Sequence, residues 1–210
     1  LLYLPFEREA VDQSWQSETR TLTTSWLTYT TVWGVKSVHV GTTWWILLTT
    51  PYPLTPVNTP EQTVSFRYYV TSQQTSTRRI LYEFRIQNQI GCASMFLENT
   101  TNLSYQTDAT DVRVTIRANQ WVHIVWVASS AWMFVYENWQ LASSWTWDST
   151  PRWVWAQSYQ QNQAILCWRD WVSYWQSFNW NVRELIMENR CWNASEVADY
   201  YNRSKAKLWL

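Results

Sequence analysis

The sequence predicts an all-β protein in which two antiparallel sheets pack as a sandwich, with one short helix near the C-terminal end. Short runs rich in β-branched and aromatic residues alternate apolar and polar positions, which is typical of half-buried strands. Polar turn residues separate these runs. The 210 residues fit one large domain, because β-sandwiches of this length are commonly undivided.

The expected strands fill most of the chain. In order they are residues 27–32, 36–40, 46–49, 63–70, 79–86, 93–97, 111–117, 121–128, 133–137 and 182–187. Residues 51–60 hold four of the six prolines and should form a loop, because proline cannot donate to a sheet ladder. Neither side of this loop alone offers a complete sandwich. We therefore expect one domain over residues 1–210.

A single helix is expected after the last strand. Asn193 precedes a helical pattern and Glu196 follows three residues later, which is a capping-box arrangement. Val197, Tyr200 and Tyr201 then fall on one face of the helix. We expect this face to dock on a sheet edge.

Composition excludes several classes of protein. The formal net charge is zero, which gives no electrostatic reason to expect nucleic acid or an acidic membrane as partner. No run of 18 apolar residues occurs, so we expect no membrane insertion. The chain begins LLYLPF, without an initiator methionine or a signal-peptide pattern, and we interpret it as a piece of a larger product.

Four N-x-[ST] sequons point to the secretory route, where such sites are glycosylated. They are at Asn99, Asn102, Asn193 and Asn202. Together with abundant Ser and Thr they predict an extracellular, cell-surface or secreted protein.

The three cysteines show no metal-binding spacing. Cys92, Cys167 and Cys191 form no CxxC or Cys/His pattern, so we expect one disulfide and one leftover thiol rather than zinc. The sequence does not decide the pairing, and we favour Cys167 with Cys191.

Tryptophan is abundant where glycine is scarce. Glycine averages about 7% of residues in proteins, whereas this chain has 3 glycines and 19 tryptophans. In residues 133–143 an alternating strand stops at Asn138-Trp139 and then resumes, where a two-residue hairpin favours Asn-Gly. Residues 12–16, 32–34, 42–45 and 143–155 likewise place tryptophan among polar turn residues, whereas Trp121, Trp192 and Trp209 lie among apolar neighbours at strand or helix edges.

We hypothesise that about a dozen tryptophans occupy backbone positions suited to glycine, through unusual decoding or an assignment error. The candidates include Trp15, Trp139 and Trp180. The alternative is a natural tryptophan-rich surface that stacks on sugars.

Several motifs follow one another in the order of a known family. Residues 4–15, LPFEREAVDQSW, are similar to an opening strand and an Asp-x-Ser-Gly turn, with Trp15 in the glycine place. GVKSVHV and TVSFRYYV match the next strands. Residues 119–143 are similar to "W-x-H-v-A … Y-v-N-G-x-l", with Trp121, His123, Tyr136 and Asn138 in step. Residues 178–201 resemble "F-x-G-x-i-D-E-v … L-S-x-x-E".

These motifs resemble the laminin-G-like and pentraxin branch of the concanavalin A-like jelly rolls, over nearly the whole chain. The resemblance implies a two-sheet antiparallel jelly-roll sandwich. The chain departs from the pattern mainly by tryptophan in place of glycine, at Trp15, Trp139 and Trp180.

The resemblance also suggests a calcium site, because many such domains bind the ion through loop oxygens at one sandwich edge. The corresponding loop, residues 168–179, offers Asp170, Gln176 and Asn179, although Arg169 lies beside the one carboxylate. If the tryptophans are real, Trp168, Trp171 and Trp175 could stack on sugars.

No enzyme motif is recognisable. The paired E-x-D-x-E carboxylates of jelly-roll glycoside hydrolases do not occur. Glu184 and Glu188 are four residues apart, with a strand parity that could place them on one face, but Glu184 lies where the resembling family keeps a structural acid. His39 and His123 lie inside strands without a legible nucleophile, so we expect His123 to be structural.

We therefore expect a non-enzymatic extracellular adhesion or structural interaction module of a cell-surface, matrix or filament glycoprotein. Its partners would be other extracellular proteins or glycans, with self-association as a further option. The alternative is a glycan-binding lectin, with or without calcium.

Overall fold

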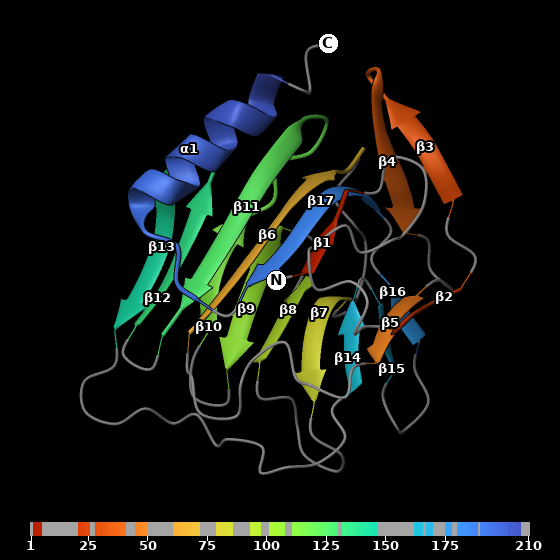
Figure 1. The fold of residues 1–210 in the computed structure, drawn as a ribbon, viewed down its shortest axis with the longest axis horizontal. Helices are drawn as coiled ribbons and strands as arrows, with labels where there is room; N and C mark the ends of the chain where they lie inside the picture. The colour runs from red at the N-terminus through yellow and green to blue at the C-terminus, as the bar shows by residue number, and fades with distance from the viewer. Residues whose placement is uncertain are drawn as a thin grey trace.

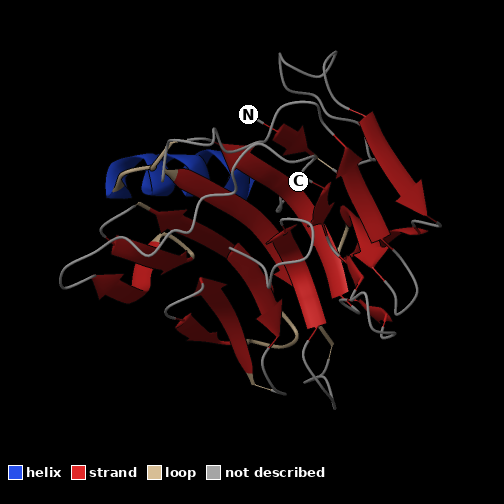
Figure 2. Cartoon of the chain, turned by 90° about the horizontal axis from the view of Figure 1, so that it is seen from below, coloured by secondary structure: helices blue, strands red, loops and turns tan. Residues whose placement is uncertain are grey.

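A computed structural model gives the fold of the chain. It describes residues 2–5, 21–25, 28–40, 45–49, 61–71, 79–85, 93–97, 101–107, 111–129, 132–146, 162–165, 167–169, 175–177, 180–188 and 190–206. Figure 1 shows how the strands and the helix are arranged, and Figure 2 shows the chain from below.

The first large sheet has eight strands. Its spatial order is β13 (Gln140–Thr146), β12 (Trp132–Glu137), β11 (Trp121–Ala128), β6 (Gln62–Tyr69), β17 (Trp180–Glu188), β4 (Val35–Val40) and β3 (Thr28–Val32), with β1 (Leu2–Leu4) also paired to β17. Every pairing is antiparallel. β6 and β11 occupy the middle of the sheet, which fits their nearly continuous burial.

The second large sheet has seven strands and packs beside the first. Its order is β10 (Asp111–Thr115), β9 (Asn102–Thr107), β8 (Ala93–Leu97), β7 (Arg79–Arg85), β14 (Asn162–Ile165), β5 (Trp45–Thr49) and β2 (Thr21–Ser25). A small third sheet pairs β15 (Cys167–Arg169) with β16 (Trp175–Ser177). The all-β, antiparallel prediction is confirmed, and each expected strand has a counterpart within a few residues.

The helix α1 (Ala194–Lys205) begins with the predicted cap. The Asn193 side-chain oxygen accepts from the Glu196 amide at 3.0 Å, and the Glu196 carboxylate accepts from the Asn193 amide at 2.8 Å. Both bonds satisfy amides that a helix start leaves without partners.

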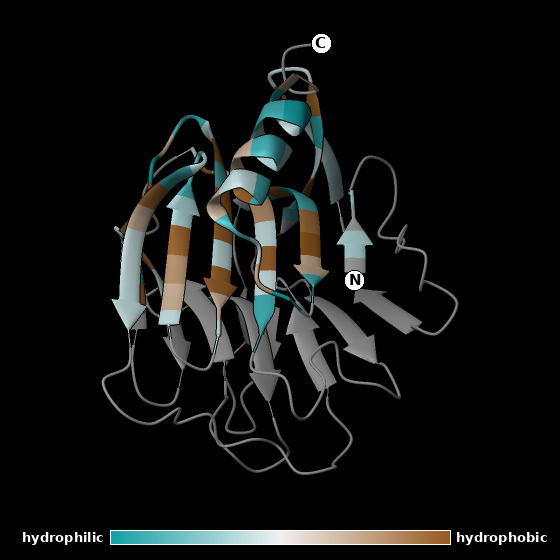
Figure 3. Cartoon of the chain, turned by 60° about the vertical axis from the view of Figure 1, so that its left-hand side comes forward, coloured by the Kyte–Doolittle hydropathy of each residue, from teal (hydrophilic) through white to brown (hydrophobic). Residues whose placement is uncertain are grey.

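The helix lies on the face of the eight-stranded sheet, not on its edge as we had expected. Val197 is fully buried and packs with Val125 and Val127 of β11 and Ile186 of β17. Figure 3 shows α1 lying along the sheet face with hydrophilic residues turned outward. The helix packs on the face and not on the edge because the face offers apolar side chains from several strands at once.

A buried ion pair lies beneath the helix. Arg67 of β6 and Glu184 of β17 are both 2% exposed, and their side chains are 3.0 Å apart. Arg67 also donates to the Ser204 hydroxyl of α1 at 2.5 Å. This pair connects the sheet to the last turn of the helix.

Glu184 marks a bulge in β17. Its φ is +54°, and the pairing of β17 with β6 shifts register between Arg183 and Ile186. Before the bulge β17 pairs with β4, and after it with β1. The bulge therefore lets β17 pair with both β4 and β1 along the same edge.

Two hairpin turns contain tryptophan at positive φ. Asn138 and Trp139, between β12 and β13, have φ values of +47° and +72°. Trp33 and Gly34, between β3 and β4, have values of +53° and +79°. Both pairs have the positive φ values that a type I′ turn requires, which agrees with the prediction that Trp139 occupies a backbone position suited to glycine.

The same prediction is wrong for Trp180. Trp180 lies inside β17, is not among the described residues with positive φ, and is only 1% exposed. Trp145, which we placed in a turn, lies in β13. Trp15 lies outside the described residues.

The predicted disulfide between Cys167 and Cys191 is not formed. Cys191 is a free thiol whose sulfur donates to the Ala128 carbonyl at 3.1 Å. Burial raises the pKa of this thiol to about 11, which keeps it protonated and unreactive at neutral pH.

Candidate binding site

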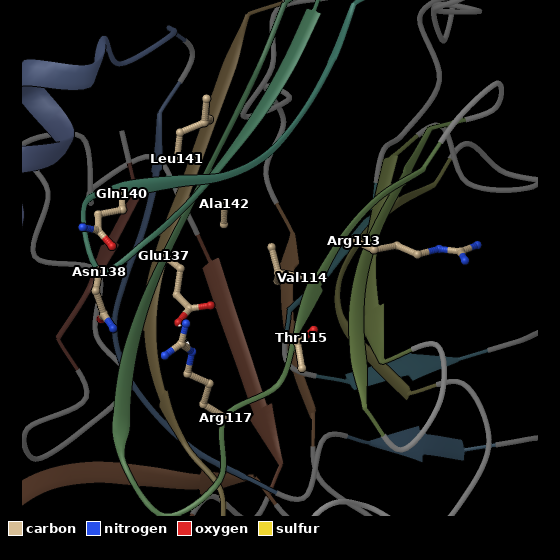
Figure 4. A pocket seen from close by; sticks show the side chains of 9 residues that line it. All are labelled: Arg113, Val114, Thr115, Arg117, Glu137, Asn138, Gln140, Leu141 and Ala142. Carbon is tan, nitrogen blue, oxygen red and sulfur yellow. Dashed lines mark ion pairs between the residues drawn. The ribbon is translucent and has the colours of Figure 1, made fainter.

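A polar pocket lies where the β12–β13 turn faces β10 and the segment after it. Its volume is about 390 Å³. Figure 4 shows its lining side chains, which are those of Arg113, Val114, Thr115, Arg117, Glu137, Asn138, Gln140, Leu141 and Ala142.

An ion pair forms one wall of this polar pocket. Arg117 Nε lies 2.5 Å from Glu137 Oε1, and the two side chains point toward each other in Figure 4. Burial raises the pKa of Glu137, and the Arg117 charge partly offsets that rise. Arg117 is 59% exposed, so its guanidinium can also donate to a ligand.

Side chains that alternate between buried and exposed positions along residues 112–117 form the polar wall of this pocket. Val112, Val114 and Ile116 are buried, while Arg113 and Arg117 are exposed. The Arg117 amide also donates to the Tyr68 hydroxyl at 3.2 Å, which anchors this segment to β6. In Figure 4 Arg113 points away from the ion pair, so Arg117 is the arginine aimed at the turn.

Asn138 holds the turn against β11. Its side-chain oxygen accepts from the His123 amide at 3.0 Å, and its own amide donates to the His123 carbonyl at 2.9 Å. Asparagine tolerates the left-handed conformation that the turn requires. The turn is therefore fixed to the sheet.

A second pocket, which we call the aromatic pocket, also includes Asn138. Its volume is about 180 Å³, and it lies between the β3–β4 turn, the start of β11 and the end of α1. Its lining residues are Trp33, Val35, Arg67, Gln120, Trp121, Asn138, Tyr201 and Lys205.

The rings of the aromatic pocket are held by contacts with each other and with the backbone. The indole nitrogen of Trp121 donates to the Val32 carbonyl at 3.4 Å. Tyr69 lies between Trp33 and Trp121, with ring centres 5.4 and 5.8 Å away. Such spacings are those of favourable aromatic pairs.

His123 is structural, as its position inside a strand indicated. Its Nε2 lies 2.8 Å from the Ser65 hydroxyl, and its ring stacks on Tyr201 at 5.9 Å. Complete burial, with a smaller contribution from the Arg67 charge, holds its pKa well below the usual range. The imidazole is therefore neutral at physiological pH.

The carboxylates considered for catalysis do not face one cleft. Glu184 is buried against Arg67 beneath the helix. Glu188 accepts from the Trp192 indole nitrogen and lies 3.0 Å from Arg190. The bulge at Glu184 breaks the strand parity that could have placed both on one face.

The predicted calcium ligands stay a prediction. Asp170 and Asn179 lie outside the described residues, and Gln176 is in β16 of the small third sheet. The described part of the chain contains no cluster of His, Cys, Asp or Glu that could hold a metal ion. The sugar-stacking candidates Trp168 and Trp175 belong to the same small sheet, and Trp171 lies outside the described residues.

The described sequons lie on accessible parts of the fold. Asn193 and Asn202 are exposed, at the cap and in the last turns of α1, and Asn102 begins β9 with partial exposure. Asn99 is outside the described residues. The side-chain oxygen of Asn193 is engaged in the cap, so glycosylation there would have to leave that bond in place.

Neither pocket was found from the sequence. A signal for the polar pocket was present, because residues 111–117 alternate apolar residues with Arg113, Thr115 and Arg117. That alternation indicates a solvent-facing row of polar side chains. The aromatic pocket gave no local signal, since its residues come from distant parts of the chain.

No family model and no curated protein matches the sequence. Several solved structures do match in fold. The binding domain of botulinum neurotoxin serotype G has a TM-score of 0.72 and 12% identity, and the match covers 98% of this chain and 51% of that one. The binding domain of Paraclostridial Mosquitocidal Protein 1 has a TM-score of 0.70 and 13% identity, covering 96% and 51%.

A third match is similar in length. Domain 4 of AbnA, an extracellular GH43 arabinanase of Geobacillus stearothermophilus solved with arabinotriose, has a TM-score of 0.65 and 16% identity. The match covers 94% of this chain and 96% of that domain. This chain thus spans about half the length of the toxin binding domains and nearly all of the arabinanase domain. These likenesses show the fold.

Among the described residues, no helix is long and apolar enough to cross a membrane.

Proposed function

We propose that this chain is a non-enzymatic, extracellular interaction module of the laminin-G-like jelly-roll class, which binds its partner at the end of the fold around the Asn138-Trp139 turn. The main observation in support of this proposal is the polar pocket beside this turn, which has a volume of about 390 Å³. Its side chains offer both donors and acceptors, which suits a polar partner surface or the hydroxyls of a glycan.

An exposed apolar side chain beside the turn supports a binding role. Leu141 of β13 is 55% exposed and lines the pocket. Exposed apolar side chains next to polar groups are common at recognition surfaces. The partner is another extracellular protein or a glycan, and the parent is a cell-surface, matrix or filament glycoprotein.

The single carboxylate of the polar pocket favours binding over cleavage. Among the described residues that line it, Glu137 is the one acid, and it is paired with Arg117. Glycoside hydrolysis uses two carboxylates that flank the bond to be broken. The arabinanase domain was solved in complex with arabinotriose, and the toxin structures are binding domains. Their likeness in fold to this chain supports a binding role.

A binding survey tests the proposal. The purified chain is screened against a glycan array and a panel of matrix proteins, with and without a calcium chelator. We expect binding to at least one partner, and we expect Arg117→Ala to weaken it about tenfold, as loss of a charged hydrogen bond does. Loss with chelator would add calcium to the proposal.

The matched control is Arg203→Ala, which removes an exposed arginine of α1 that donates to the Asp199 carbonyl. Equal loss in both variants would mean general electrostatic attraction and would overturn the assignment of the site. Release of new reducing ends from any polysaccharide, abolished by Glu137→Gln, would replace the binding module with an enzyme.

A further inference from the structure

We infer that the aromatic pocket is a second binding site, and that it takes one acidic hexose ring of a glycan. This inference rests on the proposed function, because it names one class of partner for an extracellular binding module. It concerns a different pocket from the polar one, which shares only Asn138 with it.

The size of the pocket fits a single ring. Its volume is about 180 Å³, whereas pockets for drug-sized ligands start at about 300 Å³. One sugar ring, or one ring of a longer chain that continues into solvent, matches this space.

The walls fit the two kinds of surface that a sugar presents. Trp121 offers an aromatic surface for the apolar CH side of a pyranose ring. The Tyr201 ring also lines the pocket, but His123, Arg67 and Lys205 already approach it. The amides of Gln120 and Asn138 can donate to and accept from ring hydroxyls. The hydrogen bond from Trp121 to Val32 fixes the indole before any ligand arrives, which lowers the entropy lost on binding.

The charge of the lining selects the class of sugar. Lys205 lies 5.7 Å from the centre of the Tyr201 ring, at the end of α1. Arg67 is also in the lining, but its charge is balanced by Glu184 at 3.0 Å. No described residue of the lining is acidic. Lys205 therefore leaves the pocket positive, which favours a carboxylate or a sulfate.

The same charge argues against another use of aromatic walls. Aromatic cages commonly bind quaternary ammonium groups through the negative faces of their rings. Here the Arg67 guanidinium already lies 5.5 Å from the Tyr201 ring centre, and Lys205 approaches the same ring. A cationic ligand would be repelled by Lys205, whose charge has no acidic partner in the lining.

The site does not depend on Trp33. If glycine is the natural residue at position 33, Trp121 still provides an aromatic surface and Tyr201 still lines the pocket.

The experiment uses matched ligands. Methyl β-glucuronide and methyl β-glucoside share a ring and differ at one carboxylate, and galactose 6-sulfate and galactose form a second pair. Binding of each to the full chain is measured by NMR titration. We expect at least one acidic sugar to bind about tenfold more tightly than its neutral partner, with shifts at Trp121 and Tyr201.

Variants locate the site. Lys205→Gln, at an exposed position, should remove the preference for the acidic sugar without weakening the neutral one. Tyr201→Leu should weaken both. Trp145→Ala, which removes an exposed tryptophan of β13 outside the pocket, is the control and should change neither.

Three results would overturn the inference. The first is equal binding of acidic and neutral sugars with no effect of Lys205→Gln, the second is loss in the Trp145 control as large as in Tyr201→Leu, and the third is the absence of sugar binding. If no sugar binds here while Arg117-dependent partner binding persists, the aromatic site fails and the proposed function stands. If both are lost, the proposed function fails too.

Discussion

Two Asn-Trp dipeptides in this chain have opposite structural roles. Asn138-Trp139 forms a hairpin turn, with both residues at positive φ and Trp139 47% exposed. Trp180, which follows Asn179, is 1% exposed inside β17 and lies against Tyr68 with ring centres 4.6 Å apart. The dipeptide alone does not decide the conformation. What decides it is whether the flanking strands pair with each other or with other strands.

The largest expected effect separates the two tryptophans by stability. Trp180→Ala should lower the free energy of unfolding by about 3–5 kcal/mol, because it leaves a cavity where a large ring packed. Chemical denaturation measures the change. Trp145→Ala, at a position 46% exposed, is the control and should cost far less. Equal costs would show that the Trp180 ring adds nothing to the core.

The second prediction concerns His123, the residue whose backbone holds the Asn138 turn. Its pKa is lowered in the folded state, so the unfolded chain binds more protons below the ordinary value of about 6.5. Stability should be fully present above that pH and fall below it, by up to about 1.4 kcal/mol per pH unit.

Denaturation curves at pH 7.5, 6.5 and 5.5 measure this slope. His123→Gln should lower the slope. An unchanged slope in His123→Gln would assign the acid sensitivity to other groups.

The third prediction addresses the turn itself. Trp139→Gly should raise the free energy of unfolding by about 1 kcal/mol, because a side chain at positive φ costs about 1–2 kcal/mol and the exposed ring loses little contact. Trp139→Ala keeps the Cβ atom and serves as the control, with no comparable gain. A loss of stability in Trp139→Gly would mean that the ring packs usefully in solution.

The smallest effect is expected at Trp33, the other turn tryptophan. Trp33→Gly relieves the same backbone cost but removes an edge-to-face contact with Tyr69, which is worth about 0.5–1.5 kcal/mol. The melting temperature should therefore change little. A gain as large as that of Trp139→Gly would show that the Tyr69 contact contributes nothing.

Peptide mass mapping of material from the natural source tests the decoding hypothesis directly. We expect the peptide that contains position 139 to have the mass of glycine there. A tryptophan mass would mean that the chain carries the strained turn as written. The same map reads position 180, where the family resemblance and the buried tryptophan lead to different expectations.

Local patterns in the sequence determined most of the secondary structure. Period-two alternation located strands of the eight-stranded and seven-stranded sheets, because side chains on a strand point to opposite faces in turn. The capping box located the start of α1, because Asn193 and Glu196 satisfy amides only three residues apart. The turn at Asn138 followed from two strands separated by two residues.

Tertiary structure alone decided the rest. The sequence did not show that α1 covers the sheet face, that Cys191 stays a free thiol or that Trp180 is buried. These outcomes depend on side chains that meet from distant strands, and no local pattern records such contacts. The two pockets arose in the same way: their residues come together only when the hairpin turns, β10 and α1 reach the same end of the fold.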